Sequence, residues 1–510
     1  MKIVLVKPPQ TGSNLRRQMS AFEPLGLEYL SAWIKKFGFK ATIIDAHIDR
    51  REIKQLDNSV FRVGMSIDNI RKRLIAESPA IMGVSCLFRE YSFDVVDIVN
   101  LAKQILPDAY IILGGQDAAT RPEFYFNFTK PDLIVFGEGE LTLQDILQRL
   151  RDNETLNGIP GTIELKENKI FKNVGRARIK DLDDLPFPER NLSFYLDTHI
   201  QKISFPFAKK TPAVIMQSSR GCVMKCAFCD IISVWKQWTS RSPKNIVDEI
   251  ETLNKNCGVN EFSFIDDNFM LDKKRVKNIC REILDRKLNI SFEVNPGISV
   301  WTIDEEIITL LMRAGLYRIC LPIESGSTRT LRFIGKPVDL NKTKAMIKYC
   351  NGLGLYTYGN IIIGFPFETK EDIKESIRWA FETDLDMVHF LLAEPYDGAS
   401  MFSIYKKNGW IKLENKGRFE MRLFRTKFFD IQELNKMRNN AQLRYFLHKM
   451  LKIFNPLVFR KNFWPKINSV PKFRYFTKIL FLVFSGLAIP ENFAFLKLIF
   501  KRKLLLRNYR

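Results

Sequence analysis

Short apolar runs alternate with amphipathic stretches along the first 150 residues. The run KIVLV (2–6) is continuous and rich in branched residues, which predicts a strand buried on both faces. Residues 25–38 follow with apolar positions at helical spacing and a terminal glycine, which predicts a helix. The alternation continues through strand-like runs at 40–45, 80–86, 109–115 and 133–140 and helical stretches at 92–106 and 141–150. Strand and helix in strict turn predict an α/β, doubly wound, Rossmann-like sheet.

A second alternation occupies residues 211–400. Apolar runs at 213–219, 261–267, 290–294, 317–325, 358–366 and 386–395 predict six strands, with helical patterns between them. Six βα units favour a partial (β/α)6 TIM-like barrel, whose chemistry lies at the carboxyl ends of its strands. We expect residues 151–210, rich in Pro and Asp, to form an irregular linker, and residues 401–510 to form a mostly helical module.

Composition adds that this is a multidomain globular protein. The chain has 510 residues, 46% of them hydrophobic, and eight cysteines, too few for a disulfide scaffold. Its start lacks the features of a secretory signal, so we expect a cytoplasmic protein with reduced or metal-bound cysteines.

The positive charge is concentrated at the C-terminus. Residues 401–510 hold 25 Lys and Arg against 5 Asp and Glu, together with 16 of the 41 Phe. This pattern suits a helical cap, an anionic membrane surface or lipid-like substrate, or, least favoured, nucleic acid. The apolar run at 479–490 is short of the roughly 20 residues that span a bilayer. We therefore expect at most a peripheral contact with the inner face of a membrane.

The first barrel strand is followed by three closely spaced cysteines. Cys222, Cys226 and Cys229 have the spacing C-x3-C-x2-C, and no fourth cysteine lies nearby. A structural zinc site usually has four protein ligands. Three thiolates on a [4Fe–4S] cluster leave one iron open to a substrate, and Gly221 lets the backbone turn closely around such a cluster.

This motif, with the aromatic Phe228 before its last cysteine, resembles that of the radical S-adenosylmethionine (radical SAM) enzymes. The resemblance covers residues 211–400 and implies a [4Fe–4S] cluster, S-adenosylmethionine at its open iron, and an electron donor such as flavodoxin or ferredoxin. It also implies cofactor contacts at the strand ends, at Asp266, Asp267 and Asn268, at Glu293 or Asn295, at Glu324 and Ser325, and at Gly364, Phe365 and Pro366. The acidic residues also suit helix N-caps at βα turns.

The N-terminal sheet resembles the cobalamin-binding domain that precedes many of these enzymes. That resemblance implies cobalamin, with its nucleotide tail beside Ser85, Gly114, Gly115, Gly137, Glu138, Gly139 and Glu140. His47 lies in DAHIDR (45–50), which follows the second strand and ends in Arg where a cobalt-ligand motif has Gly. We therefore do not expect His47 to bind cobalt.

Together these features predict a cobalamin-dependent radical SAM enzyme acting on a small, apolar or lipid-like molecule. The leading hypothesis is a methyltransferase that acts on an unactivated carbon or phosphorus. An oxidative cyclase with the same cofactors and a non-catalytic cobalamin or redox sensor are the alternatives. A methylthiotransferase is disfavoured, because Cys86 is the only cysteine of the N-terminal domain.

Overall fold

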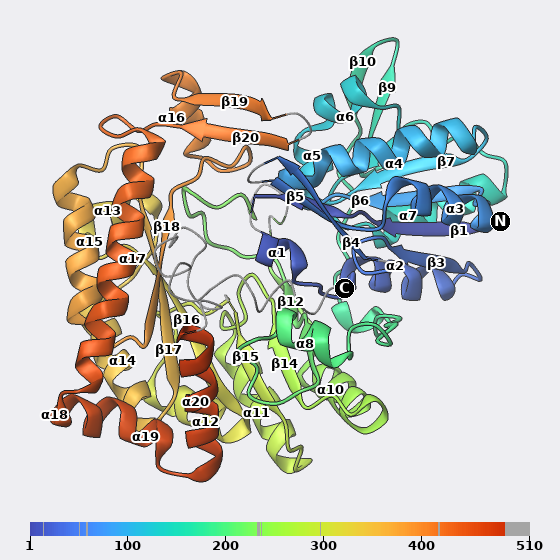
Figure 1. Cartoon of the computed structure of the whole chain (residues 1–510). Helices are drawn as coiled ribbons and strands as arrows, with labels where there is room; N and C mark the ends of the chain where they lie inside the picture. Colours follow the sequence, from blue (N-terminus) through green and yellow to red (C-terminus); the bar gives the residue numbers. More distant parts are fainter. Residues whose placement is uncertain are drawn as a thin grey trace. The chain divides into compact units, whose positions relative to one another are not determined.

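A computed structural model shows a chain of two compact units, which are described separately (Figure 1). The structure describes residues 1–13, 15–49, 51–57, 60–231, 235, 237–295, 297–416 and 419–484. The first unit comprises Met1–Ser204, Ile231–Asn245 and Leu413–Arg422, and the second comprises Phe205–Asp230, Ile246–Lys412 and the chain from Leu423 onward. The apolar run at 479–490, for which at most a peripheral membrane contact is expected, lies partly outside the described residues. Arg50 lies wholly outside them.

The first unit is built on a seven-stranded sheet of order β10-β9-β8-β7-β6-β1-β3. The strands are β1 (Ile3–Lys7), β3 (Ala41–Asp45), β6 (Ile81–Ser85), β7 (Tyr110–Gly114), β8 (Leu133–Val135), β9 (Thr162–Lys166) and β10 (Lys169–Lys172). The first five are parallel, which confirms the doubly wound sheet, and the last two run antiparallel. The helices are α2 (Leu25–Lys35), α3 (Ile67–Glu77), α4 (Ser92–Ile105), α5 (Gln116–Thr120), α6 (Pro122–Phe128) and α7 (Glu140–Arg151).

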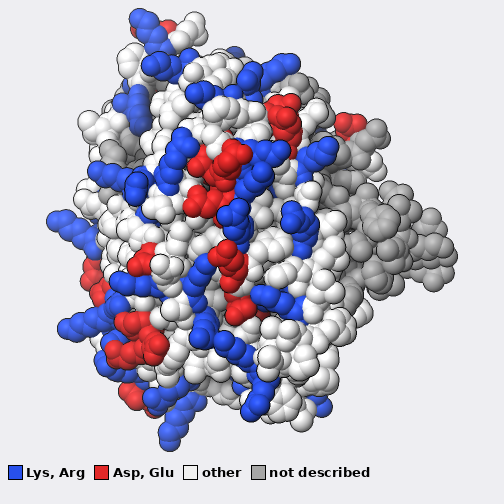
Figure 2. Space-filling model, turned by 90° about the vertical axis from the view of Figure 1, so that its left-hand side faces the viewer, with Lys and Arg blue, Asp and Glu red and all other residues white. Residues whose placement is uncertain are grey.

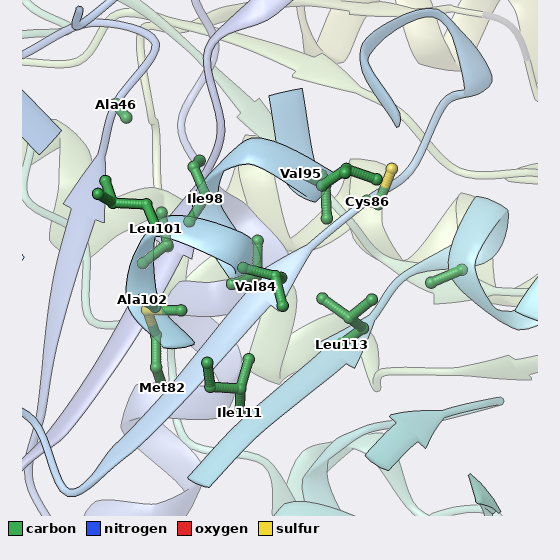
Figure 3. Packing of buried hydrophobic residues seen from close by; sticks show 14 of the residues in the cluster. Ala46, Met82, Val84, Cys86, Val95, Ile98, Leu101, Ala102, Ile111 and Leu113 are labelled. Atoms are coloured by element: carbon green, nitrogen blue, oxygen red, sulfur yellow. The ribbon is translucent and has the colours of Figure 1, made fainter. Parts of the chain in front are cut away.

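Burial explains why these segments fold as they do. The apolar face of α4 packs on β6 and β7, so a helix with apolar residues at positions three and four apart covers two continuous apolar strands (Figure 3). The residues in contact include Val95, Ile98, Leu101 and Ala102 of α4 and Met82, Val84, Ile111 and Leu113 of the strands.

Two parts of the first unit differ from the sequence prediction. Residues 151–210, expected to be an irregular linker, contribute β9 and β10 to the sheet and the helix α8 (Thr198–Ser204). A separate antiparallel sheet joins β2 (Gln10–Gly12), β5 (Val60–Gly64) and β4 (Glu52–Asp57). All six residues of β4 are exposed, including the apolar Ile53 and Leu56, so this strand has no buried face of the kind that makes a strand recognisable in sequence.

The second unit contains a six-stranded parallel sheet of order β11-β14-β15-β16-β17-β18. Its strands are β11 (Ala213–Met216), β14 (Glu261–Phe264), β15 (Ser291–Val294), β16 (Leu316–Glu324), β17 (Tyr356–Ile363) and β18 (Met387–Leu392). The intervening helices are α10 (Pro243–Cys257), α11 (Lys273–Asp285), α12 (Glu305–Ala314), α13 (Thr328–Ile334), α14 (Leu340–Leu353) and α15 (Lys370–Glu382). All six predicted strands and the βα order are confirmed.

The chain beyond the sheet is mainly helical. α16 (Phe402–Lys407) precedes a strand pair, β19 (Ile411–Lys416) and β20 (Phe419–Phe424), which the sequence analysis missed. The helices that follow are α17 (Ile431–Ile453), α18 (Pro456–Val458), the π-helical turn η3 (Phe459–Phe463), α19 (Trp464–Ile467) and α20 (Val470–Phe484). A capping box between Asp430 and Glu433 starts α17. No helix in the described part of the chain is long and apolar enough to span a membrane.

Candidate functional site

The three cysteines lie on one loop directly after β11, at the carboxyl end of the barrel's first strand. Cys226 is buried, while Cys222 and Cys229 are half-buried, and all three are free of disulfide bonds. Gly221 has φ +83°, a conformation that a residue with a side chain rarely adopts. The Cys229 amide donates to the Cys226 carbonyl at 3.0 Å, so backbone hydrogen bonding holds the second and third cysteines together.

The loop is also tied to two distant segments of the second unit. The Ala227 amide donates to the Ile334 carbonyl at 3.0 Å, and the Met401 amide donates to the Ala227 carbonyl at 2.9 Å. Burial raises the pKa of the Cys226 thiol, and the charge of Lys336 opposes that effect. The loop is therefore fixed at its centre by contacts made far away in the sequence.

Asp266 and Asp267 at the end of β14 hold the start of this loop. The Asp266 carboxylate is fully buried and accepts hydrogen bonds from the Ser218 amide (3.1 Å), the Ser218 hydroxyl (2.8 Å) and the Ser219 hydroxyl (2.6 Å). Burial raises the pKa of Asp266, against the effect of these hydrogen bonds. Asp267 accepts from the Gly221 amide at 3.0 Å. The structure thus gives both acids a supporting role, and contact with a cofactor stays a prediction.

Asn268 is the member of this group that reaches a cysteine. Its side-chain amide lies 3.6 Å from Cys222 Sγ, within hydrogen-bonding distance of a sulfur acceptor. The Ser299 hydroxyl donates to Asn268 Oδ1 at 3.1 Å and so orients the amide nitrogen toward the sulfur. Neither a helix cap nor a turn explains this arrangement, which places Asn268 in the immediate surroundings of the cysteine loop.

Glu293 is held within the sheet. Its carboxylate pairs with the Arg318 guanidinium, with an Nε–Oε2 distance of 2.7 Å, and accepts from Ser263 at 3.0 Å. Glu293 and Arg318 are register partners on β15 and β16. Asn295, the alternative, is exposed just beyond the end of β15, and is therefore the more accessible of the two predicted contacts.

Glu324 and Ser325 end β16 in a buried polar cluster. Glu324 has φ +70° and pairs with Lys336 at 2.6 Å; the side chains are 7% and 8% exposed. Lys336 also donates to the Pro322 carbonyl at 2.7 Å. The Ser325 hydroxyl lies 2.8 Å from that of Ser376 on α15. Both predicted residues therefore have protein partners, and their contact with a cofactor stays a prediction.

The turn after β17 is built on a residue that the sequence analysis omitted. Glu368 is fully buried, and its Oε2 accepts from the amides of Gly364 (2.7 Å) and Phe365 (3.0 Å). Its Oε1 accepts from the Thr330 hydroxyl at 2.9 Å. Burial raises the pKa of Glu368 to about 7. Thr369 caps the helix α15, whereas the side chain of Glu368 folds back onto the turn.

This turn contacts the cysteine loop. The rings of Phe228 and Phe365 meet with centroids 6.1 Å apart, in an edge-on arrangement. Pro366 is buried beside them, and its carbonyl accepts from the Lys427 amide at 3.1 Å. The structure therefore brings Phe228 and the predicted glycine turn together, although they are far apart in sequence.

The predicted ligand residues of the first unit line the carboxyl edge of its sheet. Ser85 and Gly114 are register partners at the ends of β6 and β7. A methyl group added at Gly114 or Gly137 would meet no atom within 4 Å, whereas at Gly115 (φ +99°) it would lie 2.3 Å from the Cys86 carbonyl oxygen. Gly115 is thus required by the fold, and Gly114 and Gly137 leave open space at the edge.

The remaining residues of that prediction are engaged within the unit. Glu138 accepts from the Ile179 amide at 2.9 Å and lies 3.4 Å from Arg178. Gly139 precedes α7, and Glu140 begins it as a buried residue.

His47 is fully buried, and its Nε2 lies 2.6 Å from the Gln18 carbonyl oxygen. Burial lowers the pKa of His47 to about 3, so the ring is neutral. The other ring nitrogen, Nδ1, is buried without a hydrogen-bond partner among the described residues, and whether His47 binds cobalt stays a prediction.

Comparison with known families identifies both units. Residues 216–380 match the model of the radical SAM superfamily, and residues 20–147 match that of the B12 binding domain. The chain carries a B12-binding domain followed by a radical SAM domain. Three thiols on one loop, beside an amide donor and free of disulfides, suit a four-iron cluster, in which each thiolate binds a different iron. Among the described residues, no three Cys, His, Asp or Glu side chains converge as ligands of a single metal ion.

Several known proteins resemble this radical SAM protein over most of its length. An uncharacterised methyltransferase of Pyrococcus horikoshii is 27% identical, covering 88% of this chain and 93% of its own. Cytidylyl-2-hydroxyethylphosphonate methyltransferase of Streptomyces wedmorensis is 27% identical, covering 77% of this chain and 79% of its own. The anaerobic magnesium-protoporphyrin IX monomethyl ester cyclase of Cereibacter sphaeroides is 24% identical over 88% and 71%.

A solved structure shows the same fold. The radical S-adenosylmethionine methyltransferase TsrM from Kitasatospora setae, with cobalamin and a [4Fe–4S] cluster bound, aligns with a TM-score of 0.69 at 16% identity, covering 86% of this chain and 90% of that one.

Proposed function

We propose that this radical SAM protein is a cobalamin-dependent methyltransferase acting on an unactivated carbon or phosphorus of a small molecule. The observation that carries the proposal is the combination, on one chain, of a B12-binding domain and a radical SAM domain with an intact three-cysteine loop. The similarity to two methyltransferases over more than three quarters of the chain supports the reaction type.

The cluster would be held by Cys222, Cys226 and Cys229. S-adenosylmethionine would lie along the strand ends, near Asn268, Asn295 and the turn at Gly364, Phe365 and Pro366, and cobalamin along the edge at Ser85, Gly114 and Gly137. When bound, these groups would supply one-electron reduction of S-adenosylmethionine and a methyl group for transfer to the substrate.

The protein's own residues would position and shield these groups. Asp266 and Asp267 fix the backbone that enters the cysteine loop, and Asn268 directs an amide at one sulfur, a contact that stabilises negative charge on a cluster ligand. Glu368 accepts from the amides of Gly364 and Phe365, and this turn packs on Phe228 of the loop. These residues would thus hold the loop and its surroundings in place.

An external electron donor of the flavodoxin or ferredoxin type would reduce the cluster, and the C-terminal helices would contact a membrane surface peripherally. Several large apolar side chains there are exposed, including Leu451 (71%), Phe454 (79%) and Leu457 (81%). Apolar groups interspersed with Lys and Arg suit the interface of an anionic bilayer. Figure 2 shows Lys and Arg mixed with Asp and Glu on the face that carries α15 and α17, so the described residues form no continuous basic surface for nucleic acid there.

The test is anaerobic purification with cobalamin supplied, followed by iron and corrinoid analysis and by mass spectrometry of reaction products. We expect about four irons and one corrinoid per chain, and a product heavier than its substrate by one methyl group. Cys226→Ala should lose iron and the production of 5′-deoxyadenosine, whereas Cys280→Ala, at a buried cysteine on α11, should keep both.

An oxidative cyclase is the second candidate, favoured by the similarity to the magnesium-protoporphyrin ester cyclases. A product that keeps the carbon count of its substrate would establish cyclisation and exclude methylation. A chain that binds cobalamin but never cleaves S-adenosylmethionine would contradict both reactions.

A further inference from the structure

A cavity lies under the barrel, at the end of the sheet opposite to the cysteine loop. It adjoins the first residues of β17 and β18, Tyr356 and Met387, and leaves about 160 Å³ for the centres of water-sized atoms. Residues of α17, α19 and α20 line it, and Figure 1 shows α19 and α20 beside the strands' starting ends. A methyl group at Gly354, in the turn before β17, would lie 2.4 Å from the Pro465 carbonyl oxygen, so α19 is packed tightly on this end.

This position separates the cavity from the proposed chemistry. The six strands are parallel, so their amino ends form one end of the barrel and their carboxyl ends the other. Barrels of this kind place catalysis at the carboxyl ends, and the opposite end normally serves stability. A hollow at the amino ends is therefore not a part of the cysteine site.

Most of the cavity wall is apolar, but two tyrosines that line it have hydroxyls without a hydrogen-bond partner. The wall includes Leu443, Met450 and Ile479 from α17 and α20. The hydroxyls of Tyr356 and Tyr358 are buried and have no hydrogen-bond partner among the described residues. The Tyr358 side chain is 6% exposed, and its hydroxyl lies beside the Cys320 thiol, which is a weak acceptor. Buried hydroxyls are normally satisfied, so these two indicate a missing acceptor.

One lysine at the cavity, Lys449, has no carboxylate of its own, because the nearby Asp386 and Asp384 already pair with Lys466 and Lys452. Its ammonium lies 5.6 Å from the centre of the Phe463 ring. Lys466 pairs with both Asp386 oxygens at 2.6 Å, and Arg318 pairs with Glu293. Lys449 is 8% exposed, and among the described residues its only hydrogen bond is to the Asp384 carbonyl at 3.5 Å. Burial lowers the pKa of Lys449 to about 8, so the side chain is mostly charged at pH 7. A buried ammonium ordinarily has an anionic partner.

We propose that this cavity binds a single-chain amphiphile with a carboxylate head, whose head meets Lys449 and the two tyrosine hydroxyls and whose chain lies among the apolar residues. At about 10–15 Å³ for each water-sized sphere, the space accommodates on the order of a dozen non-hydrogen atoms. A ten-carbon fatty acid has this size and polarity. The ligand would join α17, α19 and α20 to the barrel and so couple lipid availability to the C-terminal helices.

The test is isothermal titration calorimetry of the full-length protein with decanoate and with decanol at pH 7. We expect decanoate to bind more tightly than decanol, because only the acid provides an anionic acceptor. Lys449→Met should weaken decanoate about tenfold or more, as expected for loss of a hydrogen bond to a charged group, and should leave decanol unchanged. Lys452→Met, on the same helix but facing Asp384, is the matched control and should change neither.

A second variant tests the place of binding. Leu443→Trp fills the cavity from α17 and should abolish binding of both compounds, while Cys226→Ala should leave both unchanged. The proposal is overturned if the native protein binds neither compound, if decanol binds as tightly as decanoate, or if the Leu443→Trp protein still binds decanoate at native affinity.

Discussion

Glu368 provides the sharpest test of how the Gly364–Phe365 turn is held, because its two obvious substitutions should behave in opposite ways. In Glu368→Gln the amide oxygen can still accept from both backbone amides, and the new NH2 group can donate to the Thr330 hydroxyl. In Glu368→Ala two buried N–H groups lose their acceptor. At about 1–3 kcal/mol for each unsatisfied donor, the Ala variant should lose about 2–6 kcal/mol in free energy of unfolding.

The Gln variant should also remove a pH dependence. The pKa of Glu368 rises from 4.5 to about 7 on folding, chiefly through burial, so the folded chain retains its proton longer than the unfolded chain. The native free energy of unfolding therefore falls as pH rises between 4.5 and 7, by about 3 kcal/mol in total at about 1.4 kcal/mol for each pH unit. About 2 kcal/mol of that loss occurs between pH 5.5 and 8.

The assay is urea-induced unfolding of the native, Gln and Ala proteins at pH 5.5 and pH 8. The free energy of unfolding of the Gln variant, relative to that of the native protein, should rise by about 2 kcal/mol from pH 5.5 to pH 8. The effects of all other titrating groups cancel in this comparison, because both proteins carry them. If the difference between Gln and native is the same at both pH values, the carboxylate does not titrate as a buried group. A Gln variant as unstable as the Ala variant would show that the charge, and not the acceptor, holds the turn.

Three further predictions concern other parts of the chain. Gly115→Ala should destabilise the first unit and lower cobalamin binding, because its methyl group would meet a backbone carbonyl at 2.3 Å, whereas Gly114→Ala should keep the fold; circular dichroism melting and corrinoid content will separate them. Lys336→Met should cost about 3–5 kcal/mol in unfolding free energy by leaving the Glu324 charge buried and unpaired, and Lys336→Met with Glu324→Gln should recover most of it. Leu451→Glu, at a position 71% exposed, should leave thermal stability unchanged and reduce co-sedimentation with anionic vesicles severalfold; unchanged co-sedimentation would exclude this surface from membrane contact.

The sequence predicted those strands whose burial is reflected in a run of apolar residues. Most of the predicted strands, such as β1, β11, β14 and β15, are apolar runs that are buried along nearly their whole length. β4 and β10 are exposed along their whole length. Their ladder hydrogen bonds do not depend on side-chain type, so neither strand could be recognised in advance.

The sequence predicted only those parts of the candidate site that are marked by the cysteine spacing or by their position at the end of a predicted strand. The cysteine loop and the acids at the βα turns could be placed, because each lies a few residues after a strand. Their partners could not, because they come from elsewhere in the chain: Lys336 reaches Glu324 from beyond α13, and Arg318 reaches Glu293 from the neighbouring strand β16. Long-range pairing depends on register and on side-chain direction, which a single sequence does not reveal.

The pairing of Arg318 with Glu293 changes the role that we assign to Glu293. The sequence analysis left Glu293 and Asn295 as alternative cofactor contacts at the third barrel strand. In the structure Glu293 pairs with Arg318 of β16, and this pair belongs to the cavity end of the barrel, since Arg318 borders the cavity and contacts Tyr358. Glu293 is thus better explained as the counter-ion of a buried arginine than as a ligand of the nucleoside. If so, Glu293→Gln should raise the cost of burying Arg318, by about 3–5 kcal/mol in unfolding free energy, and leave the affinity for S-adenosylmethionine within a factor of two of the native value. Asn295→Ala, at the exposed strand end, should weaken that affinity and leave stability unchanged, and the reverse pattern would return Glu293 to the cofactor site.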